Sequence, residues 1–138
     1  MKLFVDTWGW LALADRGDAK HEAAAECYRE RSRVSKQVVT SNFVLDELLT
    51  LVFLRLSFGE ASKFANAVLA SPSVTTELVT RERFKAAMEL RMRFSDKPRI
   101  SFTDLTSMAI MKDVGVTEVM TADQHFTQVG MGFHILPD

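Results

Sequence analysis

The chain has 138 residues, of which 47% are hydrophobic and 25% are charged, and its formal net charge is −1. This length and balance predict one globular domain, residues 1–138, with a core of its own. The near-neutral charge excludes a generally basic nucleic-acid-binding protein, and the single cysteine, Cys27, excludes an internal disulfide.

The N-terminal segment superficially resembles a secretion signal, because an apolar run follows Lys2. Asp6 interrupts that run where it should be unbroken, and the apolar stretches beside it are too short to cross a bilayer. We therefore expect a buried strand that leads into a helix, in a cytoplasmic protein with no membrane partner.

The first half of the chain alternates short apolar runs with segments of helical periodicity. The expected elements are a strand at 2–6, a helix at 7–14, a helix at 18–35 with Asp18 as its N-cap, a strand at 37–40, a helix from 41 or 42 to 56, a break at 57–59 and a helix at 60–70.

The second half continues the alternation. The expected elements are a strand at 74–79, a basic helix at 81–94, a helix at 103–114 ended by Gly115, a strand at 118–121, a helical turn at 123–128 and a last strand at 133–136. Short, uniformly apolar strands separated by helices predict an α/β fold of three layers, α/β/α, around a mainly parallel sheet of about five short strands.

Four carboxylates lie at strand ends or in the first turns of the following helices: Asp6, Glu47, Asp104 and Asp123. Ligands bind outside the carboxyl ends of parallel strands, so the four can converge although they are far apart in sequence. Crowded carboxylates repel one another unless cations or protons intervene. A set of oxygen ligands suits Mg²⁺ or Mn²⁺, which can activate water for phosphodiester hydrolysis.

Each acid also has an ordinary structural explanation. Asp104 fits a capping box with Ser101, Glu47 could face solvent on its helix, and Asp123 could be a helix N-cap. Asp6 is harder to explain in this way, because a carboxylate at the end of a buried strand is costly without a partner. The spacing alone permits a metal site without specifying one.

Four short segments sharpen the interpretation: FVDT at 4–7, TSNFVLDE at 40–47, SFTD at 101–104 and TADQHF at 121–126. In order and spacing, and with the closing apolar strand, they resemble the PIN-domain family over the full length of the chain. The resemblance is greatest to the VapC-type toxin ribonucleases of VapBC toxin–antitoxin systems, and it implies a PIN-like fold.

The resemblance implies a catalytic and metal-binding site made of Asp6, Glu47, Asp104 and Asp123. It implies cleavage of RNA by a water that Mg²⁺ or Mn²⁺ activates. It also implies a homodimer, and a small antitoxin that occupies the active-site groove. Thr7 matches the polar residue that commonly follows the first aspartate, and Thr121 is a similar supporting candidate.

Other functions stay open at this point. A housekeeping RNA-processing nuclease would use the same chemistry, and a non-catalytic metal- or RNA-binding module would use the same residues. A receiver-like signalling domain would need paired acids after the first strand and a lysine near the last, but no lysine follows Lys112.

Five further features have two interpretations each. Trp8 and Trp10 could stack on bases or pack internally, and His125 could contact phosphate or pack against a helical turn. The basic segment 81–99 could guide RNA or form a solvated helix face. The apolar segment 51–58 could form a dimer interface or a wholly buried helix.

Overall fold

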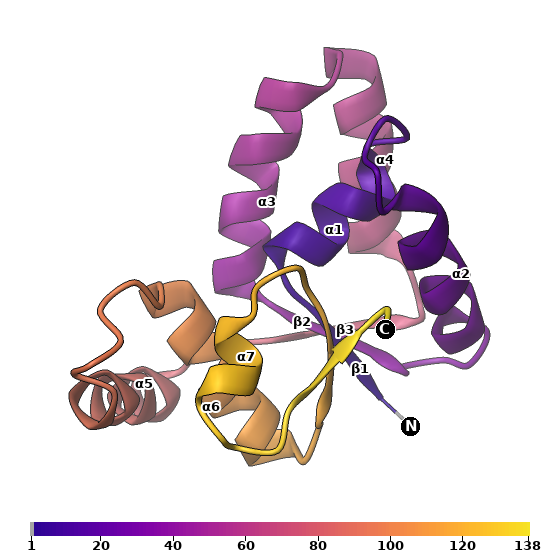
Figure 1. Cartoon of the computed structure of the whole chain (residues 1–138). Coiled ribbons are helices and arrows are strands. Elements are labelled where there is room, and N and C mark those ends of the chain that lie inside the picture. The colour runs from indigo at the N-terminus through magenta and orange to yellow at the C-terminus, as the bar shows by residue number, and fades with distance from the viewer. Residues whose placement is uncertain (1) are drawn as a thin grey trace.

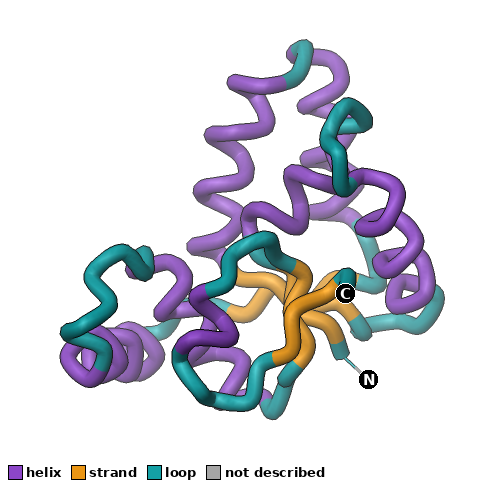
Figure 2. The backbone as a smooth tube through the Cα atoms, viewed as in Figure 1, coloured by secondary structure: helices purple, strands orange, loops and turns teal. Residues whose placement is uncertain are grey.

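The computed structural model of the chain describes residues 2–138 and contains one five-stranded sheet. All neighbouring strands are parallel, in the order β3-β2-β1-β4-β5. The strands are β1 (Leu3–Val5), β2 (Val38–Ser41), β3 (Val74–Glu77), β4 (Glu118–Met120) and β5 (His134–Leu136). Figure 2 shows them gathered at the centre with helices around them.

Seven helices surround the sheet within the described residues. They are α1 (Thr7–Ala14), α2 (His21–Ser32), α3 (Asn42–Arg55), α4 (Phe58–Ala70), α5 (Arg81–Arg93), α6 (Phe102–Val114) and α7 (His125–Gln128). Figure 1 shows α1 to α4 together on one side of the sheet, with α5 and α6 on the other. The predicted α/β class and its short parallel strands are confirmed.

The core is formed by the central strand and the helices that cover it. All three residues of β1 are completely buried, as the uniformly apolar run predicted. In α6, every residue from 105 to 111 is buried, so this helix is enclosed on all sides. Nowhere in residues 2–138 is a helix both long enough and apolar enough to span a bilayer.

The strand order reverses between β1 and β4. From β1 the chain proceeds outward through β2 and β3, and it then returns to the other side of β1 to form β4 and β5. In open parallel sheets, ligands bind at the carboxyl ends of the strands beside such a switch point. A receiver-like domain has the different order 2-1-3-4-5, so that alternative is wrong.

Two predicted helix starts need correction. The second helix begins at His21, not at residue 18, and it ends at Ser32. Asp18 is not its N-cap, because its Oδ1 accepts the backbone N–H of Lys20 in the preceding turn at 2.8 Å. The break predicted at 57–59 lies instead at residues 56–57, because α3 ends at Arg55 and Ser57 is the N-cap of α4, so that Phe58 and Gly59 lie in the first turn of that helix.

Candidate active site

Asp6 is placed at the switch point by β1, which it directly follows, and it is only 2% exposed. Its Oδ1 accepts the backbone N–H of Gly9 at 2.9 Å, so the carboxylate caps α1. The pKa of Asp6 is raised to about 7, mainly by burial. Repulsion from Asp123 and Glu47 contributes to the rise, and hydrogen bonds from Thr121 and Gly9 oppose it.

The start of α1 lies close against β4 because residue 9 has no side chain. A Cβ atom at Gly9 would lie 2.5 Å from the carbonyl oxygen of Met120 and 2.9 Å from Cγ1 of Val5. A larger residue at position 9 would therefore force α1 away from β4. It would also move Asp6 away from the loop that carries Asp123.

Glu47 is directed towards α1 by a hydrogen bond. Thr7 Oγ1 donates to Glu47 Oε1 at 2.7 Å, and Thr7 is the first residue of α1. The helix that carries Glu47 begins at the end of β2, where Ser41 Oγ accepts the backbone N–H of Val44 at 3.1 Å. Glu47 is therefore held by a partner, unlike its exposed neighbour Asp46.

The carboxyl groups of Asp104 and Asp123 lie in contact with each other. Asp104 lies in the first turn of α6, whose N-cap Ser101 accepts its backbone N–H at 3.0 Å. Burial raises the pKa of Asp104, followed by the hydrogen bond with Asp123 and by repulsion from Asp6, Asp123 and Glu47. Burial also acts to raise the pKa of Asp123, but the hydrogen bond from Asp104 and the contacts of His125 lower it overall. Of the two carboxyl groups, Asp104 is therefore the one that takes up a proton more readily.

Thr121 connects two of the carboxylates with one hydroxyl group. Its Oγ1 accepts the backbone N–H of Asp123 at 2.9 Å. The same side chain hydrogen-bonds to Asp6 and lowers its pKa. Since Thr121 is only 6% exposed, this bridge is shielded from water. Thr121 therefore fixes the position of Asp123 relative to Asp6.

His125 adds a nitrogen donor to the acidic cluster. Asp123 Oδ1 accepts the backbone N–H of His125 at 2.9 Å, and the ring Nδ1 lies 2.9 Å from the same oxygen. Asp104, Asp123 and His125 each offer one potential ligand atom, and these atoms lie within 4.8 Å of one another. Sequence reasoning singled out His125 without finding this arrangement.

The two tryptophans have different environments. Trp10 is 1% exposed and donates its Nε1–H to Thr40 Oγ1 at 3.0 Å, so it belongs to the core. Trp8 is 47% exposed, and the Arg55 guanidinium lies 5.2 Å from its ring centroid. Trp8 is therefore the one of the pair that is accessible from outside.

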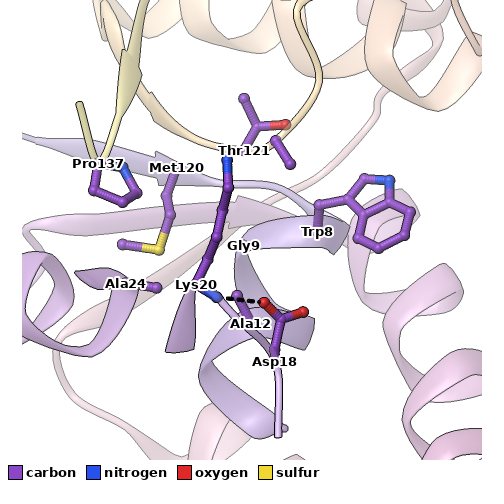
Figure 3. Close-up of a pocket in the computed structure, with 10 residues that line it drawn as sticks. Trp8, Gly9, Ala12, Asp18, Lys20, Ala24, Met120, Thr121 and Pro137 are labelled. Carbon is purple, nitrogen blue, oxygen red and sulfur yellow. Dashed lines mark hydrogen bonds between the residues drawn. The ribbon is translucent and has the colours of Figure 1, made fainter. Parts of the chain in front are cut away.

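A small cavity of about 40 Å³ lies beside the site, where α1, α2 and the end of β4 meet. Figure 3 shows the Trp8 ring at one side of it, Met120 and Pro137 at the other, and Thr121 at its border. Ligand pockets usually enclose about 300 Å³ or more, so this cavity is too small for a nucleotide.

The basic segment 81–99 is partly occupied by internal contacts. Arg83 pairs with Glu77 and Asp113 at 2.9 Å each. Arg91 donates to the backbone carbonyl oxygens of Phe94, Lys97 and Ile100. Four basic side chains of this segment are exposed: Arg81, Lys85, Arg93 and Arg99. Its capacity to guide RNA is therefore smaller than the sequence count indicated.

The chain is similar to known proteins over nearly its whole length. The chain is 36% identical over 128 residues to the 23S rRNA-specific endonuclease VapC20 of Mycobacterium tuberculosis, covering 93% of this chain and 94% of the relative. The crystal structure of that toxin, described as cleaving the sarcin–ricin loop, superposes with a TM-score of 0.81 at 32% identity, covering 94% of this chain and 95% of the other.

A more distant structure shares the fold. VapBC2 from Rickettsia felis, bound to a DNA fragment from its promoter, superposes with a TM-score of 0.76 at 13% identity, covering 98% of this chain and 97% of the other. The model of the PIN domain matches residues 3–131, which is nearly the whole chain. The chain therefore belongs to the PIN-domain family, and within it resembles the VapC-type toxins.

Proposed function

We propose that this chain is a divalent-metal-dependent endoribonuclease that hydrolyses RNA phosphodiester bonds with an activated water. The observation that supports this most is the mutual electrostatic effect of Asp6, Glu47, Asp104 and Asp123, which come from four distant segments of the chain. Repulsion from the neighbouring carboxylates contributes to the raised pKa of Asp6 and of Asp104, and such crowding is costly unless a cation neutralises it. We propose these four as the catalytic and metal-binding residues.

The donor set fits Mg²⁺ or Mn²⁺, because all four groups offer carboxylate oxygens and one of them, Asp6, is buried. Such an ion would supply a polarised water and would stabilise negative charge on the leaving oxygen. The chain itself orients the carboxylates: Thr7 holds Glu47, and Thr121 holds Asp6 and Asp123. We therefore assign Thr7 and Thr121 as positioning residues.

The toxin role follows from the relatives. Because the similar Mycobacterium tuberculosis protein is named as an endonuclease specific for 23S rRNA, ribosomal RNA is the first substrate to test. We infer a cytoplasmic toxin of a type II pair, neutralised by a cognate antitoxin. We further infer a homodimer, since Leu54 and Phe58 are 76% and 77% exposed at the turn between α3 and α4.

A housekeeping RNA-processing nuclease is the alternative with the same chemistry. A short adjacent reading frame that encodes a DNA-binding antitoxin favours the toxin, and its absence favours the housekeeping role. The non-catalytic alternative, a metal- or RNA-binding module, would bind Mn²⁺ and leave RNA intact over long incubation.

The test uses two neighbouring substitutions on α3. We expect Glu47→Gln to abolish Mn²⁺-dependent cleavage of ribosomal RNA, because it removes a charged ligand without changing size. Asp46→Asn, on the exposed face beside it, should retain full activity. Asp6→Asn should likewise be inactive while keeping a cooperative thermal unfolding transition. Full activity of Asp6→Asn or Glu47→Gln would overturn the site, and sequencing of the products from induced cells would identify the RNA.

A further inference from the structure

His125 lies against the acidic cluster, and the proposed function gives it no role. We propose that Nδ1 of His125 is a ligand of the divalent cation that Asp104 and Asp123 bind, and that this nitrogen shifts the site's preference from Mg²⁺ towards Mn²⁺. The inference rests on the metal site of the proposed function, and it names a ligand and a selectivity that the four carboxylates alone do not supply.

The first support is the contact between Nδ1 and Asp123. The two atoms are 2.9 Å apart, and the ring nitrogen therefore lies directly against the carboxylate. Within residues 2–138, this nitrogen is shielded from solvent and has no hydrogen-bond partner. Two adjacent ligands, each about 2.1 Å from one cation at a right angle, lie about 3.0 Å apart. The observed separation therefore fits two adjacent ligands of one ion.

The second support is the position of Asp104. Its carboxyl group contacts that of Asp123, and one oxygen of each lies within 4.8 Å of a ring nitrogen of His125. Two carboxylates and an imidazole on one side of an ion leave its other positions to water or to a substrate phosphate. The three donors can thus face a single ion.

The third support is the rigidity of the turn that carries the ring. Thr121 Oγ1 holds the backbone of Asp123, and Asp123 Oδ1 in turn holds the backbone N–H of His125. The next residue, Phe126, is completely buried and packs edge-on against Phe133 with ring centroids 6.1 Å apart. Anchored on both sides, the imidazole does not depend on the ion to reach its position.

The chemistry of the donors gives the direction of the selectivity. Mg²⁺ prefers oxygen ligands, whereas imidazole suits the transition metals. A nitrogen in place of one oxygen ligand therefore favours Mn²⁺. A histidine that only paired with Asp123 as an imidazolium would instead compete with either cation equally.

The decisive measurement is pulsed electron paramagnetic resonance of the full chain loaded with Mn²⁺. We expect a ¹⁴N hyperfine coupling from directly bound imidazole in the wild type, and its loss in His125→Gln. His134→Gln is the matched control, because His134 is an exposed residue of β5 that contacts Asp138, and this variant should keep the coupling. Calorimetric titration should show about a tenfold loss of Mn²⁺ affinity in His125→Gln and little change for Mg²⁺.

The outcomes separate this inference from the proposed function. Bound Mn²⁺ without nitrogen coupling in the wild type, or with coupling that persists in His125→Gln, would overturn the ligand assignment and leave the carboxylate site intact. Equal losses of Mg²⁺ and Mn²⁺ affinity in His125→Gln would overturn the selectivity. No binding of either ion to the folded wild type would overturn both this inference and the metal-dependent nuclease.

Discussion

The two sides of the carboxylate site are held in different ways. On the α1 side, which we call the donor-held side, neutral groups donate to carboxylates: Thr7 to Glu47, and Gly9 to Asp6. On the α6 side, which we call the proton-sharing side, Asp104 contacts another carboxyl group directly.

This difference separates the roles of the two sides in binding a cation. Neutral donors orient the carboxylates of the donor-held side, although burial outweighs them at Asp6 and raises its pKa to about 7. Two carboxyl groups in contact cannot both ionise without a large cost in free energy. On the proton-sharing side, a bound cation would therefore take the place of the proton on Asp104. Cation binding should therefore release protons from Asp104 and, near neutral pH, from Asp6, while the hydrogen bonds of Thr7 and Gly9 keep the donor-held carboxylates oriented.

The largest expected effect is a loss of stability of the metal-free protein as the pH rises. Folding raises the pKa of Asp6 from 3.8 to about 7. Its stabilising contribution is therefore complete below pH 3.8 and is lost as the pH rises through about 7, at a cost on the order of 4 kcal/mol. Urea unfolding with a chelator present, from pH 4 to about pH 8, measures this loss.

Two comparisons assign that loss to Asp6. The variant Asp6→Asn should show a flatter dependence of unfolding free energy on pH, and Mg²⁺ added to the wild type at pH 8 should restore much of the lost stability. If the metal-free wild type and Asp6→Asn had the same pH dependence, burial of Asp6 would not be the cause.

The fold could be predicted from the sequence because its signals are local and repeated. Short apolar runs such as 2–6 and 118–121 can be fully buried strands when helices separate them, and the observed β1 and β4 lie inside those runs. The errors at Asp18 and Ser57 have a common physical reason. Asp and Ser side chains can bond to the backbone in a turn or in a cap, and sequence alone does not say which bond forms.

The site could be predicted only in part. The rule for parallel sheets pointed to Asp6 and Asp123, whereas Glu47 and Asp104 had ordinary helical explanations and were joined to the site by resemblance. The bridging hydroxyl of Thr121 and the direction of the His125 ring depend on a turn whose geometry forms only in the folded chain. The pattern Thr-x-Asp-x-His at 121–125 was the available signal for both.

A smaller change in stability, a gain instead of a loss, is expected from a substitution on the proton-sharing side. At pH 8 the wild type must either take up a proton on Asp104 or hold two charges together, and Asp104→Asn avoids both costs because its amide donates to Asp123. We expect this variant to be inactive and yet more stable without metal, by about 2 kcal/mol in urea unfolding. Asp113→Asn is the control on the same helix, and it should be slightly less stable because it loses an exposed pair with Arg83. A destabilised Asp104→Asn would contradict proton sharing.

The smallest effect tests whether the donor-held side depends on single hydroxyl groups. Thr7→Val keeps the shape of the side chain and removes the 2.7 Å bond to Glu47, which should cost about 1 kcal/mol of stability and about tenfold in Mn²⁺ affinity. Thr50→Val is the control on α3, because the Thr50 hydroxyl donates only to the backbone carbonyl of Asp46. Its Mn²⁺ affinity should equal that of the wild type. Equal affinities for all three proteins would mean that Glu47 keeps its position without Thr7, and that packing of α3 alone holds this side of the site.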